Sequence, residues 1–256
     1  MTEAEARASL RAAGVPDPAR DAQVLARAAP DAGTFAEWIA RRSAREPVSY
    51  ILGRRAFWNH EFRVTADVLD PRPETETLVE QALAVPFDRV LDLGTGSGCI
   101  LLSLLAERPE ASGLGTDLSE AALDVARGNA AALGFTGRAA FRQADWLTGI
   151  DGTFDLVVAN PPYIAAAEMP GLAPELRRWE PDLALSPGGD GLDAYRTITR
   201  DVPAHLARGG RLMVEIGATQ AAAVTALFAA AGLTNIGVHS DLDGRDRVVC
   251  GEKAAI

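Results

Sequence analysis

The sequence predicts an α/β protein: a mainly parallel sheet with a C-terminal antiparallel hairpin, preceded by a small N-terminal helical domain. Two observations predict this class. Between residues 89 and 216, short apolar runs alternate with helical patterns, which is typical of parallel strands joined by helices. Residues 1–54 instead show helical spacing of apolar residues among alanines, interrupted by glycine and proline.

Composition and charge narrow the class of function. The chain has 256 residues, 48% of them hydrophobic, which suffices for one large domain and a small one. No apolar run approaches the roughly twenty residues that span a bilayer, and the acidic start lacks a signal-peptide hydrophobic region. We therefore expect a cytoplasmic protein. The net charge of −10 disfavours tight nucleic-acid binding, because each phosphate contact needs a Lys or Arg.

Three segments are expected along the chain. Residues 1–54 form three or four short helices, residues 55–70 alternate like the strands of a hairpin linker, and residues 71–256 form the α/β domain. Five arginines gather near the first boundary, where they could contact a protein partner or form a solvated face. They are Arg41, Arg42, Arg45, Arg54 and Arg55. No metal-ligand spacing is present, and Cys99 and Cys250 are expected to be buried free thiols.

The α/β domain opens with a helix start and a glycine turn. Pro71 to Glu74 place proline and an acid in the first turn of a helix. The buried strand 89–93 then runs into a G-x-G-x-G turn before a helix from Cys99 to Glu107. Glycines let a ligand approach the backbone, and the helix N-terminus favours an anionic group. The candidate ligand-binding residues of this turn are Gly94, Thr95, Gly96, Ser97 and Gly98.

Acidic residues follow the next two predicted strands. Asp117 ends the strand 112–117, about twenty residues beyond the turn, where an acid commonly binds ribose hydroxyls. The alternative is a role at the helix N-terminus, which Ser119 could fill equally well. Asp145 and Trp146 follow the segment from Arg138 to Ala144 and could receive an adenine amino group and cover its ring. A tryptophan at that place could equally be a lid over the core.

The fourth predicted strand, residues 154–159, ends in Asn160, Pro161, Pro162 and Tyr163. Two prolines in succession stiffen the backbone, so this tetrad holds the Asn160 side chain and nearby carbonyls in a fixed arc. Such an arc offers acceptors to a planar NH2 group and leaves its nitrogen facing an electrophile, with the Tyr163 ring against the plane. The alternative is a plain turn, since Asn-Pro and Pro-Pro are common turn signals.

The four motifs are expected to converge on one cleft. They stand at the ends of four successive strands, and ligands of open α/β sheets bind beyond the carboxyl ends of strands. After Tyr163 we expect a long loop to about Gly191, a helix, a strand at 211–216, another helix and a closing hairpin around Ile236 and Val248.

Taken in order, these motifs resemble the HemK/PrmC family of peptide chain release factor glutamine N5-methyltransferases. The resemblance covers nearly the whole chain. It is carried by residues 68–80, by Asp92-Leu93-Gly94-Thr95-Gly96-Ser97-Gly98, by Asn160-Pro161-Pro162-Tyr163-Ile164, and by the stretches 46–53, 57–64, 180–181 and 188–195. One departure is Asp70, which stands before Pro-Arg-Pro-Glu-Thr-Glu where the family usually has an apolar residue.

The resemblance implies a Rossmann-like class I methyltransferase domain that takes a methyl group from S-adenosylmethionine and leaves S-adenosylhomocysteine. The glycine turn would pass beside the methionine part, Asp117 would hold the ribose, and Trp146 with Asp145 would flank the adenine. The tetrad from Asn160 to Tyr163 would hold the substrate glutamine and carry catalysis, with Asn160 also beside the cofactor. Residues 1–54 would recognise the substrate. We expect the protein to be a monomer. The substrate implied is the Gly-Gly-Gln glutamine of class I release factors, whose methylation modulates translation termination.

Three other functions remain open at the level of sequence. An adenine-N6 nucleic-acid methyltransferase also binds a planar NH2 group after flipping the base, although the acidic balance and missing basic domain disfavour it. A ribosomal-protein glutamine methyltransferase uses the same chemistry. A cofactor-binding module without catalysis is a third alternative, disfavoured by the intact Asn160 tetrad.

Overall fold

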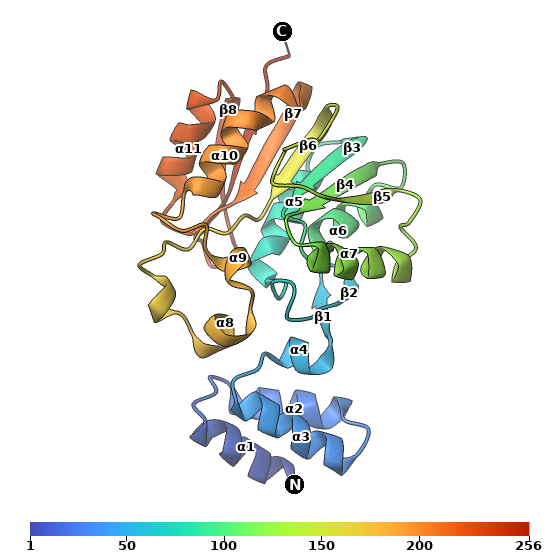
Figure 1. Ribbon diagram of the computed structural model, residues 1–256, viewed down its shortest axis with the longest axis vertical. Coiled ribbons are helices and arrows are strands. Elements are labelled where there is room, and N and C mark those ends of the chain that lie inside the picture. The colour runs from blue at the N-terminus through green and yellow to red at the C-terminus, as the bar shows by residue number, and fades with distance from the viewer. Residues whose placement is uncertain (256) are drawn as a thin grey trace.

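The N-terminal domain is a bundle of short helices at one end of the molecule (Figure 1). The computed structural model describes residues 1–255. The helices are α1 (Glu3–Ala12), α2 (Pro18–Ala28), α3 (Ala32–Ser43) and α4 (Val48–Leu52). Thr2, Asp17 and Asp31 cap the first three by accepting a backbone N–H, which satisfies a donor that the helix leaves free. Their apolar faces meet in one small core, where Leu10, Leu25 and Ile39 are buried.

A short hairpin connects the bundle to the sheet. Gly53 ends α4 in the left-handed conformation, with φ of 70°, which only glycine adopts without steric cost. Strands β1 (Arg54–Phe57) and β2 (His60–Arg63) then pair antiparallel. After a loop come η1 (Pro73–Thr75) and α5 (Glu76–Leu83), so the proline-initiated helix expected from Pro71 to Glu74 is present.

Seven strands form the central sheet, and they confirm the predicted fold class. They are β3 (Arg89–Leu93), β4 (Ser112–Asp117), β5 (Ala139–Gln143), β6 (Phe154–Ala159), β7 (Leu206–Glu215), β8 (Thr234–Ser240) and β9 (Asp246–Glu252). Their order is β5-β4-β3-β6-β7-β9-β8. Strands β3 to β7 are parallel to one another, and β9 pairs antiparallel with both β7 and β8. The strand order reverses between β3 and β6, so this is where a ligand cleft is expected.

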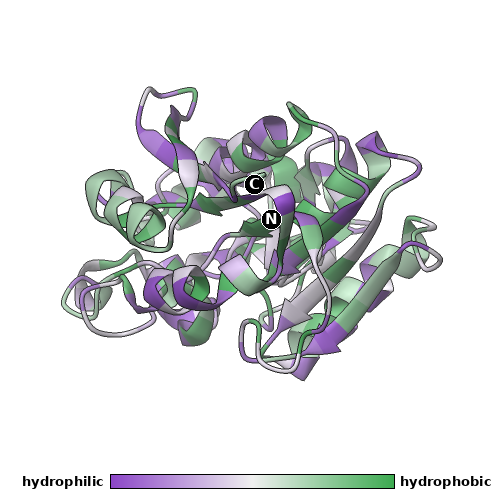
Figure 2. Cartoon of the chain, turned by 90° about the horizontal axis from the view of Figure 1, so that it is seen from above, coloured by the Kyte–Doolittle hydropathy of each residue, from purple (hydrophilic) through white to green (hydrophobic). Residues whose placement is uncertain are grey.

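Helices cover both faces of the sheet because the buried strands alternate their side chains between two cores. One core packs α5 and α6 (Cys99–Glu107) against Val90, Leu156 and Val158, and α7 (Glu120–Ala132) joins it through Ala130. The opposite core packs α10 (Asp193–Asp201) and α11 (Ala221–Ala230) against Val157; η3 (Val202–Ala204) follows α10. Figure 2 shows apolar residues concentrated in the central strands and hydrophilic ones mostly around the periphery.

The segment 164–191 differs from the long loop that the sequence predicts. It contains three short helical pieces, η2 (Met169–Gly171), α8 (Pro174–Trp179) and α9 (Asp182–Leu185). Prolines stand in the first turns of η2 and α8 and at the N-cap of α9, where proline starts a helix but prevents its extension backward. We call residues 164–191 the strap. It leaves the sheet after β6 and descends towards the N-terminal helices (Figure 1).

Across residues 1–255, the structure contains no helix with the length and apolar character needed to cross a membrane.

Candidate active site

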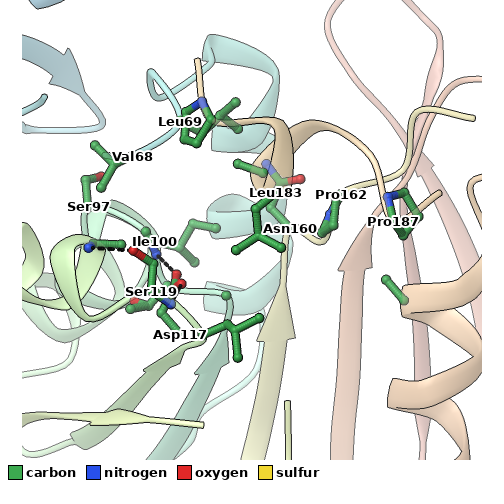
Figure 3. Close-up of a pocket in the computed structure, with 18 of the residues that line it drawn as sticks. Val68, Leu69, Ser97, Ile100, Asp117, Ser119, Asn160, Pro162, Leu183 and Pro187 are labelled. Atoms are coloured by element: carbon green, nitrogen blue, oxygen red, sulfur yellow. Dashed lines mark hydrogen bonds between the residues drawn. The ribbon is translucent and has the colours of Figure 1, made fainter. Parts of the chain in front are cut away.

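A cavity of about 350 Å³ lies beyond the carboxyl ends of the parallel strands. It is lined from the glycine turn, the ends of β4 and β5, the loop before η1, the tetrad after β6, the strap and α10. Figure 3 shows two opposed sets of lining residues: Ser97, Ile100, Asp117 and Ser119 on one side, and Asn160, Pro162, Leu183 and Pro187 on the other. The cleft predicted from the four motifs therefore exists, and the two sides differ in construction.

The glycine turn forms the wall of the first side. Gly94, Gly96 and Gly98 all have positive φ, between 53° and 80°, so L-residues would be strained there. A Cβ placed on Gly96 would meet no atom within 4 Å, which means that the space beside this residue is open to the cleft. Gly98 has a different role, since its Cβ would come within 3.3 Å of Ala126 on α7; it allows close helix packing and does not line the cavity.

Asp117 binds the backbone of the glycine turn. Its Oδ2 accepts the Gly96 N–H at 2.9 Å and its Oδ1 accepts the Ser119 N–H at 2.9 Å. Ser119 itself is the N-cap of α7, accepting from Ala122, so the alternative capping role falls to Ser119. Burial raises the pKa of Asp117, and these backbone hydrogen bonds oppose the rise. A carboxylate has about four lone-pair positions, which leaves Asp117 capacity to accept ligand hydroxyls.

Asp145 and Trp146 also line the cavity, at the end of β5. Trp146 has φ of 52°, a conformation that is rare for a bulky residue and signals a local constraint. Its ring lies 3.9 Å from the position of a Cβ on Gly94, so the indole stands beside the glycine turn. It also packs on the sheet core as a partly buried residue, as the alternative of a core lid requires. Its contact with an adenine ring stays a prediction.

Sequence reasoning gave no separate role to Asp92, which supports the glycine turn from within the core. Asp92 is fully buried, and its Oδ2 accepts the Thr95 hydroxyl at 2.7 Å. Burial raises the pKa of Asp92 to about 7, against the effect of the Thr95 hydrogen bond. Its Oδ1 has no partner among the described residues. The sequence does contain a signal for this role of Asp92: it is an acid in an otherwise apolar strand, three residues before Thr95.

The tetrad is split between the cleft and the core. Asn160 and Pro162 line the cavity, whereas Pro161 and Tyr163 do not. The Asn160 Nδ2 donates to the Thr75 Oγ1 at 3.2 Å. The Tyr163 ring packs on the sheet core, and its hydroxyl donates to the Glu215 Oε1 at 3.4 Å. Tyr163 thus lies outside the lining of the cavity, and its contact with a bound amide plane stays a prediction.

The strap forms the outer part of the second side. Within the strap, the Ile164 N–H donates to the Leu185 carbonyl at 3.1 Å. Gln220 joins the strap to the tetrad, because its Nε2 donates to the carbonyls of Tyr163 at 3.0 Å and Gly191 at 3.4 Å. Leu183 on α9 lines the cavity with its side chain half exposed. Polar contacts therefore hold the strap beside the tetrad and leave an apolar side chain at the mouth.

Arg72 links the loop before η1 to the strap, a role that sequence reasoning left open. It lines the cavity and pairs with Glu180, whose side chain is 1% exposed. Burial raises the pKa of Glu180, and the charge of Arg72 opposes the rise. The unusual Asp70 is also buried; its nearest cation is Arg55, with Nε 3.7 Å from Oδ1. Arg55 Nε also donates to the Pro71 carbonyl at 3.0 Å.

Two arginines of the N-terminal cluster, Arg42 and Arg45, form ion pairs inside the molecule. Arg45 Nε donates to the Glu175 Oε1 on α8 at 2.6 Å, and Arg42 Nη2 lies 3.1 Å from the same oxygen. Arg42 also pairs with Asp21. These side chains are 7–15% exposed, so neither a free contact surface nor a solvated face describes Arg42 and Arg45. They join the N-terminal bundle to the strap.

The residues of the first side fit the adenosyl cofactor that the sequence implies. The open space beside Gly96 admits a ligand against the backbone, Asp117 offers carboxylate acceptors for ribose hydroxyls, and Trp146 offers a flat apolar face. The second side offers an amide, prolines and an ion pair, which suits a polar side chain brought in by another molecule. The two sides of the cleft therefore differ in chemistry, and Asn160 belongs to the second.

Comparison with known proteins agrees with this geometry. The family model of the methyltransferase small domain matches residues 65–177. The chain is similar to the release factor glutamine methyltransferase of Cereibacter sphaeroides, with 57% identity over 94% of this chain and 93% of that protein. It is also similar to the release factor glutamine methyltransferase of Rhodospirillum rubrum, with 47% identity over 96% of this chain and 82% of that protein.

Solved structures support the fold. A methyltransferase from Pyrococcus furiosus superimposes with a TM-score of 0.60 at 14% identity, covering 78% of this chain and 91% of that one. A ribosomal protein L11 methylase from Lactobacillus delbrueckii subsp. bulgaricus superimposes with a TM-score of 0.51 at 23% identity, covering 71% and 78%. The α/β domain therefore has the class I methyltransferase fold.

Proposed function

Because the chain belongs to the release factor glutamine methyltransferase family, we propose that it methylates the side-chain nitrogen of the Gly-Gly-Gln glutamine in class I release factors. This modification would modulate translation termination. The chain is an S-adenosylmethionine-dependent methyltransferase. Bound S-adenosylmethionine supplies an electrophilic methyl group, and the first side of the cleft, with Gly96, Asp117 and Trp146, would hold it.

The chemical difficulty lies with the nucleophile, which the second side of the cleft would position. An amide nitrogen is a poor nucleophile because its lone pair is delocalised into the carbonyl. As its bond to the methyl carbon forms, the carbon–sulfur bond breaks and the nitrogen loses a proton. Holding nucleophile and electrophile in line can contribute about 7–11 kcal/mol at the measured upper range.

Asn160 carries this proposal. Its Nδ2 is engaged by Thr75, so its Oδ1 remains to accept a hydrogen from an incoming NH2 group. Pro161 does not itself line the cavity, but the family resemblance implies that its carbonyl, next to Asn160 in the chain, would accept the second hydrogen. Both acceptors would also stabilise the positive character that develops on the NH2 group during transfer. Pro162 shapes the wall, and Tyr163 would fix the tetrad from the core side through its contact with Glu215.

Residues 1–54 would form the substrate-recognition domain, with residues 55–70 as linker and 71–256 as the methyltransferase domain. The ion pairs of Arg42 and Arg45 with Glu175 support this division of labour, because they connect the N-terminal bundle to the strap beside the tetrad. We further propose that the protein is a cytoplasmic monomer without tight affinity for nucleic acid, in line with its net charge of −10.

Methyl transfer to purified substrates tests the function. The protein is incubated with labelled S-adenosylmethionine and, in parallel, with a release factor, a ribosomal protein and DNA. Label should enter the release factor alone, and peptide mass spectrometry should place it on the Gly-Gly-Gln glutamine. Label in the ribosomal protein or in adenine of the DNA, with an unmodified release factor, would overturn the assignment.

A further inference from the structure

Gln220 joins the two ends of the strap through a single side-chain amide. It lies in the turn after β7, at the N-cap of α11, and is partly buried. Its Nε2 donates to the Tyr163 carbonyl at 3.0 Å and to the Gly191 carbonyl at 3.4 Å. Tyr163 directly precedes the strap, and Gly191 is the last residue of the strap. The proposed chemistry gives Gln220 no role, although Gln220 contacts the last residue of the tetrad.

The orientation of the Gln220 amide follows from its partners. Its Oε1 accepts the Gly217 N–H at 3.0 Å. A backbone N–H can only donate and a backbone carbonyl can only accept, so an exchange of the two ends of the amide would break the contacts on both sides. The hydroxyl of the buried Tyr195 also lies 3.4 Å from Oε1. Gln220 therefore directs its donor group to the strap and its acceptor to the turn after β7.

Two glycines allow this close approach. A Cβ on Gly191 would lie 2.4 Å from the Tyr163 carbonyl oxygen and 3.1 Å from the Gln220 Nε2. A Cβ on Gly217 would lie 3.1 Å from the Gln220 Oε1. A larger residue at either position would push the amide away from its partners. The Gln220 amide thus fills the space that these glycines leave between the strap and the turn after β7.

Further hydrogen bonds connect the base of the strap to the cavity lining. The Ile164 N–H donates to the Leu185 carbonyl at 3.1 Å, and the Ser186 hydroxyl donates to the Ile164 carbonyl at 2.6 Å. Ser186 and its neighbour Pro187 line the cavity. Figure 3 shows Pro187 on the same side of the cavity as Asn160. The position of Pro187 relative to Asn160 therefore depends on how the base of the strap is closed.

We propose that Gln220 is a positioning residue for the methyl transfer: by holding both ends of the strap, it keeps the cavity-lining part of the strap in place beside the tetrad. This inference rests on the proposed function, because the strap and the tetrad belong to the side of the cleft assigned to the protein substrate. Loss of Gln220 should impair methylation of that substrate. It should leave S-adenosylmethionine binding intact, since none of its hydrogen bonds reaches the first side of the cleft.

Kinetics of two variants in the full-length protein test this role. Gln220→Met and Gln220→Glu keep about the length of the side chain and remove its donor group at alkaline pH. In both variants, kcat/KM for a release factor should fall at least tenfold at about pH 8, where the introduced carboxyl is ionised. The dissociation constant for S-adenosylmethionine should stay within about twofold of the wild-type value by calorimetry.

The pH profile separates positioning from a packing role. A carboxylate cannot donate to the Tyr163 carbonyl, but a protonated carboxyl can. The two carbonyls that face it should raise the pKa of the carboxyl introduced by Gln220→Glu above its usual value of about 4.3. The activity of Gln220→Glu relative to wild type should therefore recover as pH falls from about 8 to about 5.5. Gln220→Met gains no donor, so its relative activity should stay low.

Other titrating groups are removed by comparison with the wild type. The charged groups that act on Tyr163 are Glu215, Arg247 and Arg72. Of these, Glu215 titrates in the tested range, because burial raises its pKa to about 7. It titrates in the variants as well, so each activity is divided by the wild-type activity at the same pH.

The control is Gln81→Glu, the same change on α5 at a position that does not line the cavity. It should keep wild-type activity at every pH. A kcat/KM of Gln220→Met within twofold of wild type, or a loss in Gln220→Glu that does not depend on pH, would overturn the positioning role. If Gln220→Met fails to fold, the pH profile of Gln220→Glu decides. A wild-type protein that leaves release factor unmodified would instead overturn the proposed function.

Hydrogen exchange tests the base of the strap without turnover. The N–H groups of Ile164 and Ala166 donate to carbonyls within the strap, so they should exchange slowly in the wild type. In Gln220→Glu at about pH 8 both should exchange at least tenfold faster than in the wild type at the same pH, whereas the Ala144 N–H, which is bonded at the end of β4, should keep its protection. Unchanged protection of Ile164 and Ala166 would show that Gln220 does not hold the strap, whatever the activity of the enzyme.

Discussion

The two sides of the cleft are built in different ways. On the first side, which we propose holds the cofactor and call the cofactor side, a hydrogen bond joins Gly96 to Asp117, 21 residues apart. The second side, which we propose holds the substrate and call the substrate side, is held by hydrogen bonds between residues far apart in the chain. Asn160 bonds to Thr75, Arg72 to Glu180 and Arg45 to Glu175, with separations of 85, 108 and 130 residues. The first side is a strand–turn–helix unit with its neighbouring strand, whereas the second is an assembly of distant segments.

Because of this difference, we expect cofactor binding and substrate positioning to depend on different parts of the cleft. Backbone atoms and a short-range carboxylate form the cofactor side, so its shape depends on conformations that glycine allows locally. Side chains of the tetrad, η1 and the strap line the second side, and contacts with β7 and the N-terminal bundle support them. Its shape therefore depends on long-range pairing. Changes on the first side should therefore alter cofactor affinity, and changes on the second should alter turnover and protein-substrate recognition.

The largest effect is expected from Asn160→Ala. Loss of an acceptor that strengthens during transfer should lower kcat by about 10²–10³-fold, while calorimetry should find S-adenosylmethionine affinity within a few-fold of wild type. Asn59→Ala, at an exposed position, is the matched control and should keep full turnover. A large loss of cofactor affinity in Asn160→Ala would contradict the proposal that the two sides of the cleft bind different ligands.

Asp117→Ala should produce the converse result. Hydrogen bonds to a charged group contribute about 1.5–3 kcal/mol, so the dissociation constant for S-adenosylmethionine should rise roughly ten- to a hundredfold. At saturating cofactor, kcat should stay close to wild type. Asp124→Ala on the exposed side of α7 serves as the control. Unchanged cofactor binding by calorimetry would contradict the place given to Asp117.

Glu175→Gln tests the link between the N-terminal bundle and the strap. It removes the acceptor charge for Arg42 and Arg45, so the strap should loosen and KM for a release factor should rise about three- to tenfold, equivalent to roughly 0.7–1.4 kcal/mol. Cofactor affinity should not change, and hydrogen exchange should increase in residues 164–191.

The control for this variant is Glu120→Gln, which removes an exposed ion pair with Arg127 and should have little effect, as exposed pairs contribute little. If Glu175→Gln and Glu120→Gln behave alike in KM and exchange, the strap does not depend on the N-terminal bundle.

The last prediction concerns the effect of pH on stability through Asp92, the buried carboxyl behind the glycine turn. The pKa of Asp92 is raised by burial from 3.8 to about 7, so between these values the folded state holds a proton that the unfolded state releases. Its contribution to stability is full below pH 3.8 and is lost as pH rises to about 7, by at most about 1.4 kcal/mol per pH unit. Asp92→Asn should remove this slope, as denaturant unfolding at pH 5, 6 and 7 would show. Parallel pH curves for the two proteins would contradict the raised pKa.

The four motifs at the strand ends were recognisable from sequence because each depends on local backbone chemistry. Apolar runs predicted the parallel strands, glycines marked the turn, and successive prolines marked the rigid tetrad. The strap was not predicted correctly, because its helical pieces are too short to show a repeated apolar face. The packing of the Tyr163 ring against the sheet core was not predicted either, since the sequence does not show to which side a loop side chain turns.

By itself, the sequence determined the order of strands and helices, the cofactor turn and the acceptor-rich tetrad, because these follow from residue conformation and short-range periodicity. Only the tertiary structure decided that Thr75 bonds to Asn160 and Glu215 to Tyr163, that Glu180 pairs with Arg72, and that Arg42 and Arg45 pair with Glu175 of the strap. Such contacts join segments about 50 to 130 residues apart. They arise from the packing of the whole sheet, which leaves no local pattern in the chain.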